Sequence, residues 1–270
     1  MKQNCTKDIA RVLSFNIRVG VDSSLTQVAS DLYQLNAELS AFQELARHWS
    51  LGRSLDQTHY LASAQGHRNH AFMPLLQRAW SSDPYQGGPF HFEPFKFRGG
   101  SNETSKLYQD QLGYYGIGVS ASGVLKDKGA IYLPFATDEQ RGAQVFSWSY
   151  GNMSQPLIVL NTHLSVNKSE RYTQVKCIVK YLKQTDAPLL ILGDLNDSVQ
   201  SELLHDLQLE LGLGNLASEF GLENEFSYSV KNPSCRIDHI LGRGLKVHDF
   251  GIAKMIRSSD HFPVWADISW

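Results

Sequence analysis

Short apolar runs recur from one end of this sequence to the other, and they constrain its fold more than any other feature. Their length and composition are typical of buried β-strands. Pro156 and Pro188 stand at the starts of two runs, where the missing N–H of proline costs a sheet least. We therefore expect strands at Val12–Phe15, Leu39–Phe42, Leu157–Leu160, Leu189–Leu192, Ile237–Leu241 and Val264–Ile268.

Apolar stripes with helical spacing lie between some of these runs. Residues 25–35 and 172–182 carry such stripes, with Ser169 as the expected N-cap of the second. A third helix is expected to begin near Asp197. Because strands alternate with helices, we predict an α/β protein whose sheets are covered by helices on their outer faces.

Length and charge set the broad class. Hydrophobic residues make up 42% of the 270 residues and charged residues 19%, which is ordinary for a soluble domain with a large core. We expect a single domain over residues 1–270. The net charge of −2 provides no general attraction to a phosphate backbone, although a bound metal would supply local positive charge.

Cysteine usage and the N-terminus bear on the compartment. Three cysteines without CxxC spacing argue against a disulfide framework or a zinc site. Residues 1–11 contain no apolar signal-peptide core, and no apolar run approaches the length of a membrane span. We expect a monomer, located in the cytoplasm, without a transmembrane segment.

Residues 66–113 differ from the rest of the chain. Glycines and prolines are frequent there, and aromatic residues are closely spaced from Trp80 to Phe97. A structureless loop of this length is unusual in a compact domain, so we interpret the segment as a functional or partly ordered excursion. The segment would either form a satellite apolar cluster that covers a sheet edge or take part in substrate binding. Substrate binding would include contact of its aromatic residues with a membrane surface.

Acids, amides and imidazoles stand at the ends of the predicted strands. Strand ends are rigid platforms, and ligands of sheet proteins often bind just outside them. Each residue alone has an ordinary explanation, such as a turn for Asn16 or a helix cap for Asp194. Because so many fall at strand ends, we predict that they converge on one site. The set is Asn16, Gln43, Glu44, Asn161, His163, Asp194, Asn196, Asp238, Asp260 and His261.

The order of these segments resembles that of the endonuclease/exonuclease/phosphatase superfamily, which has the DNase I-like fold. The Gly193–Asn196 and Ser259–His261 segments are specific in combination, whereas Tyr115–Gly118 alone is a weak match. The resemblance implies a four-layer α/β/β/α sandwich (α+β): two facing mixed β-sheets flanked by helices, with the active site at one end. The matching segments are Leu13–Arg18, Phe42–Glu44, Tyr115–Ser120, Gln140–Ala143, Asn161–Leu164, Gly193–Asn196, Arg236–Leu241 and Ser259–Val264.

The same resemblance implies hydrolysis of phosphate esters with Mg²⁺ or Mn²⁺. Phosphate esters resist attack because their oxygens are negatively charged, so a catalyst must neutralise that charge and deliver an activated water. Glu44 is the candidate metal ligand, because a hard cation prefers carboxylate oxygen. Asn16 would join that shell or orient Glu44. Asp260 would bind a second metal or form a hydrogen bond within the site.

The resemblance also assigns catalytic roles. Asp194 would position or deprotonate the attacking water, and Asn196 would hold a phosphoryl oxygen without titrating. His163 and His261 would stabilise the developing charge, more effectively as imidazolium than as imidazole. Asp238 would orient His261 and raise its pKa.

Four further residues receive supporting roles. Arg141 is a candidate substrate-binding residue that would either reach phosphate or brace neighbouring acids, and we slightly favour the brace. Arg171 and Gln174 match a family pattern that we take as structural. Asp197 is expected to cap a helix.

Three functions remain open. A Mg²⁺-dependent phosphoesterase acting on a small or lipid substrate is slightly preferred, because of the near-neutral charge and the aromatic excursion. A nuclease is the main rival, since aromatics interleaved with Lys96 and Arg98 would stack on bases and the His67–His70 cluster hints at phosphate contact. However, the sequence shows no long basic stripe of the sort that duplex binding needs. A catalytically silent protein-binding module would show losses among the matched residues, and none is lost.

Overall fold

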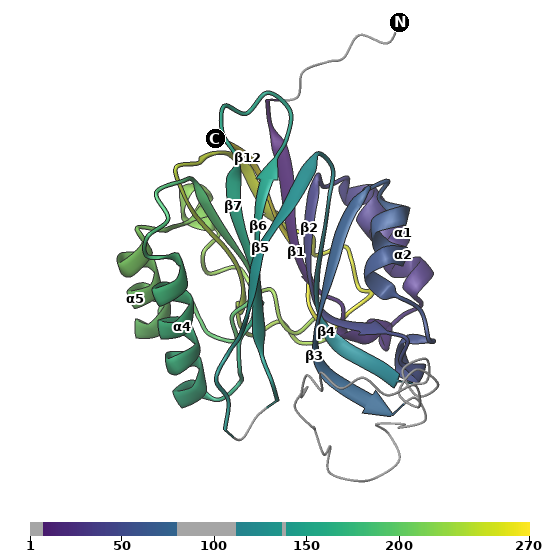
Figure 1. The fold of residues 1–270 in the computed structure, drawn as a ribbon. Helices are drawn as coiled ribbons and strands as arrows, with labels where there is room; N and C mark the ends of the chain where they lie inside the picture. The colour runs from purple at the N-terminus through teal and green to yellow at the C-terminus, as the bar shows by residue number, and fades with distance from the viewer. Residues whose placement is uncertain (1–7, 80–111, 137–138) are drawn as a thin grey trace, which may run out of the picture.

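Two mixed β-sheets face each other in the computed structural model, which describes residues 8–79, 112–136 and 139–270. Each sheet has six strands, and helices cover its outer face, so that the layers run helix, sheet, sheet, helix (Figure 1). The predicted four-layer α/β/β/α sandwich is confirmed.

The first sheet contains the first and the last strand of the described chain. Its central strands β1 and β2 are parallel, and all of its other neighbouring strands are antiparallel. In spatial order the strands are β11 (Lys246–Ile252), β12 (Val264–Ser269), β1 (Ala10–Asn16), β2 (Leu39–Arg47), β4 (Leu112–Ala121) and β3 (Asn69–Ala79).

The second sheet repeats this pattern of strand directions. Its central strands β7 and β8 are parallel, with antiparallel neighbours on both sides. The two sheets therefore present the same arrangement, with one parallel pair in the middle of each. In spatial order the strands are β5 (Val124–Tyr132), β6 (Gly142–Ser149), β7 (Leu157–His163), β8 (Leu189–Asp194), β10 (Asp238–Arg243) and β9 (Gly214–Asn215).

A helix connects the two strands of each parallel pair. Helix α1 follows β1, helix α4 follows β7, and each packs on the outer face of its own sheet beside α2 or α5 (Figure 1). The helices are α1 (Leu25–Leu35), α2 (Gln57–Ala64), α4 (Lys168–Leu182) and α5 (Glu202–Leu211), with short 3-10 helices η1 (Arg18–Gly20), η2 (Ser50–Gly52) and η3 (Leu216–Phe220).

Two predicted helix starts are wrong. Asn167, rather than Ser169, caps α4, because the Asn167 side chain accepts two N–H groups of the first turn. Helix α5 is capped by Ser201 and begins at the next residue, so Asp197 is not its cap. In both cases another side chain close by offers the better geometry.

The inner strands are buried on both faces. On β8, Leu190 and Leu192 point into the space between the sheets, whereas Leu189 and Ile191 pack toward α4 and α5. This alternation explains why such strands occur in the sequence as unbroken apolar runs. Burial of each of these side chains contributes roughly 1.5–3 kcal/mol.

All of the predicted strands are present, as β1, β2, β7, β8, β10 and β12. The edge strands β3, β5, β9 and β11 were not predicted, because an edge strand need not contain an apolar run; β5 has no fully buried residue. The inner strands β4 and β6 were not predicted either, because glycines and polar residues interrupt their apolar residues. Strand β3 occupies residues 69–79, the first part of the predicted excursion. The aromatic part, residues 80–111, lies outside the described residues. No helix in the described part of the chain is long and apolar enough to cross a membrane.

Candidate active site

Polar residues at the ends of the central strands meet at one end of the sandwich, where these strands terminate. In the second sheet, Asp194 ends β8 and pairs in register with His163 on β7 and with Asp238 on β10. Strands β7 and β8 are parallel and β10 is antiparallel, so these three residues lie at the same sheet edge. Asn16, at the end of β1 in the first sheet, reaches across to Asp194. The two sheets therefore share one polar cluster.

Asp194 lies at the centre of this cluster and is 1% exposed. Its Oδ2 accepts a 3.1 Å hydrogen bond from Nδ2 of Asn16, and its Oδ1 accepts a 3.0 Å hydrogen bond from the backbone N–H of Asn196. Two imidazoles face the same Oδ2. Nε2 of His163 lies 3.4 Å away, and Nε2 of His261 lies 3.7 Å away.

The environment of Asp194 disfavours its charged form. Burial raises the pKa of Asp194 to about 7, and the charge of Asp238 contributes to the rise. The positive charge of His261 and hydrogen bonds from Asn16 and Asn196 act in the opposite direction. A carboxylate with a pKa near neutral is matched to taking a proton from water.

His261 is held by a carboxylate behind it. Its Nδ1 donates to Oδ2 of Asp238 over 2.9 Å, and both side chains are buried. Burial lowers the pKa of His261, but the charge and hydrogen bond of Asp238, together with Asp194 and Asp260, raise the pKa to about 10. His261 is therefore an imidazolium at neutral pH. The ring of Tyr228 packs on it, with centroids 4.7 Å apart.

His163 has a cation behind it instead. Nη1 of Arg141 lies 2.8 Å from Nδ1 and 2.9 Å from Nε2 of His163, and the same Nη1 lies 3.0 Å from Oε1 of Glu139. Burial, Arg141 and His261 hold the pKa of His163 well below its usual range. These surroundings oppose the positive charge that was expected on His163, in contrast to His261. Arg141 is 5% exposed and braces His163 and Glu139, so its geometry favours the bracing role over direct substrate contact.

Glu44 approaches the cluster from the first sheet. A β-bulge between Phe42 and Leu45 and a φ of 55° at Glu44 turn its side chain out of the regular pleat. Nδ2 of Asn16 donates to Oε1 of Glu44 over 2.9 Å, and Oδ1 of Asn16 accepts the backbone N–H of Arg18. The Asn16 amide thus turns its NH₂ group toward the acids, which suits orienting Glu44 rather than binding a cation.

The donor set at Glu44 fits a hard cation. Glu44 is partly exposed and forms no ion pair with any described residue, so a carboxylate oxygen is available next to water. Asp194, Asp238 and His261 also offer ligand atoms within 4.8 Å of one another. There, however, Oδ2 of Asp238 already accepts the proton of His261 Nδ1, and the remaining Oδ1 is buried away from water, whereas Mg²⁺ keeps several water ligands. We therefore favour Glu44 as the metal ligand.

Asp260 lies at the rim of the cluster. Its Oδ2 is 3.6 Å from Nη1 of Arg18, which also donates to Asp22. The predicted alternatives for Asp260 were a second metal and a hydrogen bond within the site, and the structure gives it an ion pair and a bond from Ser259. A guanidinium already supplies positive charge at this point.

The loop after β8 is held by side chains from its surroundings. Asn196 has a φ of 50°, and its Nδ2 donates to the carbonyl of Leu164 over 2.9 Å. Arg171 pairs with Asp197 at 3.2 Å, and Gln174 accepts a backbone N–H from the loop after β7. The Asp197 side chain therefore forms an ion pair with Arg171 instead of capping a helix.

A buried amide pair joins the two sheets beneath the site. Nε2 of Gln43 on β2 donates to Oδ1 of Asn161 on β7 over 2.9 Å, and Nδ2 of Asn161 donates to the carbonyl of Gly118 on β4. Both side chains are fully buried. The sequence marked both residues as strand-end polar groups but gave no sign that they pair. Glu139 was missed altogether, and its only signal is an acid two residues before Arg141.

The His67–His70 cluster does not act as a unit. His67 is buried, with Nδ1 2.9 Å from Oγ of Ser120 and Nε2 2.9 Å from the carbonyl of Ala37. This arrangement is structural, and it removes His67 as a phosphate contact. Lys96 and Arg98, the other basic candidates, lie outside the described residues.

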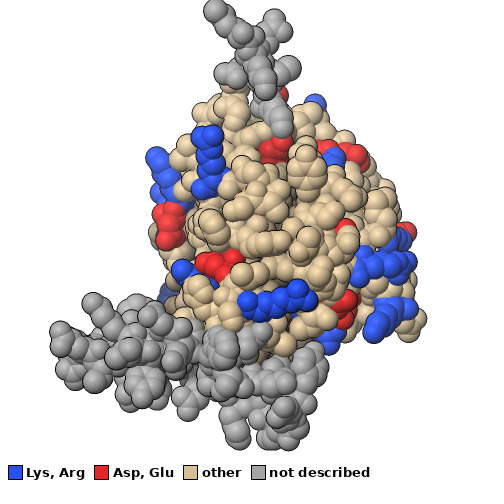
Figure 2. All heavy atoms as spheres, turned by 90° about the vertical axis from the view of Figure 1, so that its right-hand side faces the viewer, with Lys and Arg blue, Asp and Glu red and all other residues tan. Residues whose placement is uncertain are grey.

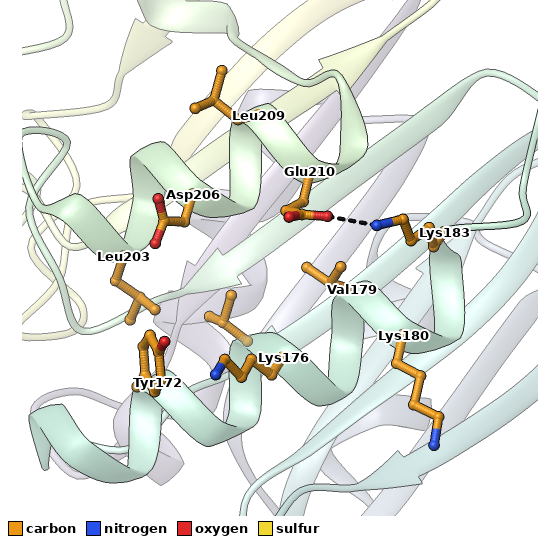
Figure 3. A pocket seen from close by; sticks show the side chains of 10 residues that line it. Tyr172, Lys176, Val179, Lys180, Lys183, Leu203, Asp206, Leu209 and Glu210 are labelled. Atoms are coloured by element: carbon orange, nitrogen blue, oxygen red, sulfur yellow. Dashed lines mark hydrogen bonds and ion pairs between the residues drawn. The ribbon is translucent and has the colours of Figure 1, made fainter.

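A surface groove of ≈ 500 Å³ lies between α4 and α5, on the outer face of the second sheet (Figure 3). Apolar and charged side chains line it together, and Lys183 pairs with Glu210 across it. The groove contains none of the strand-end residues and does not belong to the candidate active site.

The sequence model of the Endonuclease/Exonuclease/phosphatase family matches residues 13–261 of the chain. No curated protein matches it by sequence. Among solved structures, an endonuclease/exonuclease/phosphatase from Beutenbergia cavernae superposes with a TM-score of 0.72 at 17% identity, covering 97% of this chain and 72% of that chain.

Two further solved structures have the same fold. A mannosyl-6-phosphatase from Bacteroides thetaiotaomicron has a TM-score of 0.65 at 14% identity, covering 97% of this chain and 100% of that chain. D. rerio TDP2, complexed with a single-strand DNA product, has a TM-score of 0.65 at 16% identity, covering 98% and 100%. At these identities the structures establish a shared DNase I-like fold.

Proposed function

The chain belongs to the Endonuclease/Exonuclease/phosphatase family, and from this premise we propose that it is a Mg²⁺-dependent hydrolase that directs water onto a phosphate ester. The position of Asp194 carries the proposal. This buried carboxylate has a pKa of about 7, faces two imidazoles and is joined through the Asn16 amide to the partly exposed Glu44. Water activation and charge stabilisation are thereby available side by side.

The second sheet supplies the proton chemistry. Asp194 orients the attacking water and accepts its proton. Asn196 donates an N–H to a phosphoryl oxygen, since only one of its two amide hydrogens is used by Leu164. His261, as imidazolium, and His163, as a neutral donor, stabilise the negative charge that develops on the phosphoryl group.

The first sheet supplies the metal ligand. Glu44 holds Mg²⁺, or Mn²⁺ in its place, and Asn16 fixes the orientation of Glu44 through the 2.9 Å hydrogen bond. When bound, the cation neutralises charge on the phosphoryl oxygens and so makes the phosphorus more electrophilic.

A small or lipid phosphoester is the preferred substrate. Asp194, His163 and His261 are at most 5% exposed, so the phosphate must enter a recess to reach them. Lys and Arg are scattered among acidic and neutral residues on the face that carries α1 and α2, without a continuous basic band there (Figure 2). That face carries helices rather than the strand ends, so the preference rests on this recess and on the net charge of −2, which provides no general attraction to a duplex. We also propose a monomer acting in the cytoplasm, and contact of the aromatic excursion within residues 66–113 with a lipid surface.

A nuclease is the second candidate function. The favouring observation is the shared fold with D. rerio TDP2, whose structure contains a single-strand DNA product. Single strands are flexible enough to present one phosphate to a recess, so this candidate is restricted to single-stranded substrates.

A substrate panel separates these candidates. Turnover would be measured with Mg²⁺ and with Mn²⁺ on bis(p-nitrophenyl) phosphate, p-nitrophenyl phosphate, sphingomyelin vesicles, a single-stranded oligonucleotide and plasmid DNA. We expect metal-dependent hydrolysis, fastest on a small or lipid ester. Faster cleavage of the oligonucleotide would favour the nuclease, and absence of hydrolysis across the panel would contradict the proposal. Gel filtration checks the monomer.

A further inference from the structure

An arginine stands just before β10, and the proposed chemistry gives it no role. Arg236 is two residues before Asp238 in the chain and is 3% exposed. Its Nη1 donates to the carbonyl of Leu222, and its guanidinium carbon lies 5.1 Å from the centre of the Phe250 ring. Phe250 belongs to the core between the two sheets, so the guanidinium is held in that core.

Arg236 and Asp238 both carry buried polar atoms without a partner. In the described part of the chain, Nε and Nη2 of Arg236 form no hydrogen bond, and neither does Oδ1 of Asp238. Such atoms are rare in protein interiors. The other oxygen of Asp238 accepts Nδ1 of His261, which precedes β12 of the first sheet. A guanidinium with unused donors and a carboxylate with an unused oxygen therefore share the space between the sheets.

Buried charges act on each other without direct contact. Screening by water and salt is weak in the interior, so the guanidinium stabilises the ionised form of Asp238. Burial lowers the pKa of Arg236 to about 10, and the charges of Asp238, Glu223 and Glu225 oppose that fall. Because a group with this pKa is protonated at neutral pH, Arg236 is a permanent cation next to Asp238.

We infer that Arg236 is a positioning residue whose charge keeps the proton shared by Asp238 and His261 on His261. This proton lies between Oδ2 and Nδ1, which are 2.9 Å apart. Two arrangements compete: a carboxylate with an imidazolium, and a carboxylic acid with a neutral imidazole. A cation on the carboxylate side favours the first arrangement, because only there does Asp238 carry the negative charge that attracts Arg236.

The consequence for the reaction rests on the proposed function. An imidazolium stabilises the charge that develops on a phosphoryl group better than a neutral imidazole does. Asp194 and Asp260 also favour the positive charge of His261. Both of these acids remain when Arg236 is changed, so a variant of Arg236 alters only the balance between Asp238 and His261.

The ¹H–¹⁵N NMR signal of the His261 Nδ1–H group reports where this proton lies. The signal is identified by its loss in His261→Gln. In Arg236→Met, which keeps an unbranched stem but no charge, we expect the proton to move toward Asp238. Its resonance should shift downfield and its one-bond N–H coupling should decrease. Arg236→Lys, which keeps the charge, should retain the wild-type values. An unchanged signal in Arg236→Met would overturn the inference.

Arg243→Met is the matched control. Arg243 lies at the other end of β10 and donates to the carbonyls of Leu211 and Thr185, so its loss should leave the His261 signal unchanged. A shift of equal size in this control would overturn the inference, because the effect would then not depend on the charge next to Asp238.

A reciprocal measurement needs no variant of Arg236. Asp238→Asn removes the carboxylate charge and keeps the shape of the side chain, so the Nε–H resonance of Arg236 should shift. An unshifted resonance would overturn the inference even if Arg236→Met failed to fold.

Hydrolysis of bis(p-nitrophenyl) phosphate separates the inference from the proposed function. We expect Arg236→Met to lower kcat by less than Asp238→Asn does, with KM unchanged. The expected NMR shifts in a protein whose wild type hydrolyses no ester would support the inference and contradict the proposed function.

Discussion

The two parallel strand pairs of this molecule, β1–β2 and β7–β8, have the same topology but carry different polar residues. Each stands in the middle of its sheet and is connected by a helix on the outer face. The parallel pairing of β1 with β2 ends at Asn16 and Gln43, next to the partly exposed Glu44 in the β2 bulge, whereas the β7–β8 pair ends in the buried His163 and Asp194. One topology thus provides two equivalent platforms, and burial decides what each can do.

Burial separates the two chemistries. A carboxylate oxygen next to water is accessible to a hydrated cation, whereas a carboxylate removed from water gains affinity for a proton. Glu44 is of the first kind, and Asp194, with its pKa of about 7, is of the second. The division predicts different consequences when either platform is altered.

The largest effect is expected on the buried platform. Asp194→Asn keeps the shape of the side chain but removes its proton affinity, so kcat should fall by about 10³-fold. The free energy of unfolding, measured by urea titration, should not decrease, because the variant removes a buried charge next to Asp238. A variant with near-wild-type kcat would show that another group activates the water.

A smaller loss of kcat is expected when Asp238, the carboxylate that holds His261, is changed. Asp238→Asn removes the charge that keeps His261 protonated and should lower kcat by roughly 10²-fold. His261→Gln provides the comparison, since the two variants act on one unit and their effects should not add. Additive losses in the double variant would mean that Asp238 works independently of His261.

The hydrogen bond between Gln43 and Asn161, which joins the two sheets, should affect stability rather than catalysis. Gln43→Leu leaves the Oδ1 of Asn161 buried without its donor, which should cost about 2 kcal/mol of unfolding free energy. Urea unfolding and kcat would be measured on the same preparation. A large fall in kcat with unchanged stability would move Gln43 from the scaffold into the catalytic machinery.

The smallest effect is a pH dependence within the second sheet. Burial and Arg236 lower the pKa of His239 to about 4, so the unfolded chain binds more protons than the folded chain at mildly acidic pH. Stability from this group is complete above about pH 6.5 and is lost as pH falls toward about 4. Between about pH 7.5 and about pH 5.5 wild type should lose about 1 kcal/mol more than His239→Asn. An equal loss in both proteins would contradict a neutral buried His239.

How much of the fold and of the candidate site could be predicted from the sequence depended on burial. Six inner strands were predictable because they contain short apolar runs, and their ends indicated where polar residues meet. The inner strands β4 and β6 were missed, because glycines and polar residues interrupt their apolar residues. Edge strands such as β5 have no such pattern. The two platforms could not be told apart from sequence: Glu44 and Asp194 are both acids at strand ends, and only packing shows that one is exposed and the other buried.

The groups behind the histidines were equally hard to predict. Asp238 was assigned to His261 through the family resemblance, but the choice of roles for Arg141 was left open and Glu139 was missed. The Gln43–Asn161 pair connects residues 118 positions apart. Such contacts arise from the way in which the two sheets face each other, and no local pattern contains that information.

Mn²⁺ binding to Glu44→Gln and Asp194→Asn, measured in parallel by electron paramagnetic resonance, tests the division most directly. Loss of the carboxylate ligand in Glu44→Gln should weaken Mn²⁺ binding by at least about 10–100-fold, which is the loss typical of removing an outer-shell partner. Asp194→Asn should bind Mn²⁺ like wild type while failing to hydrolyse bis(p-nitrophenyl) phosphate. The opposite pattern, normal binding in Glu44→Gln and lost binding in Asp194→Asn, would place the metal in the Asp194–Asp238–His261 cluster and contradict the account.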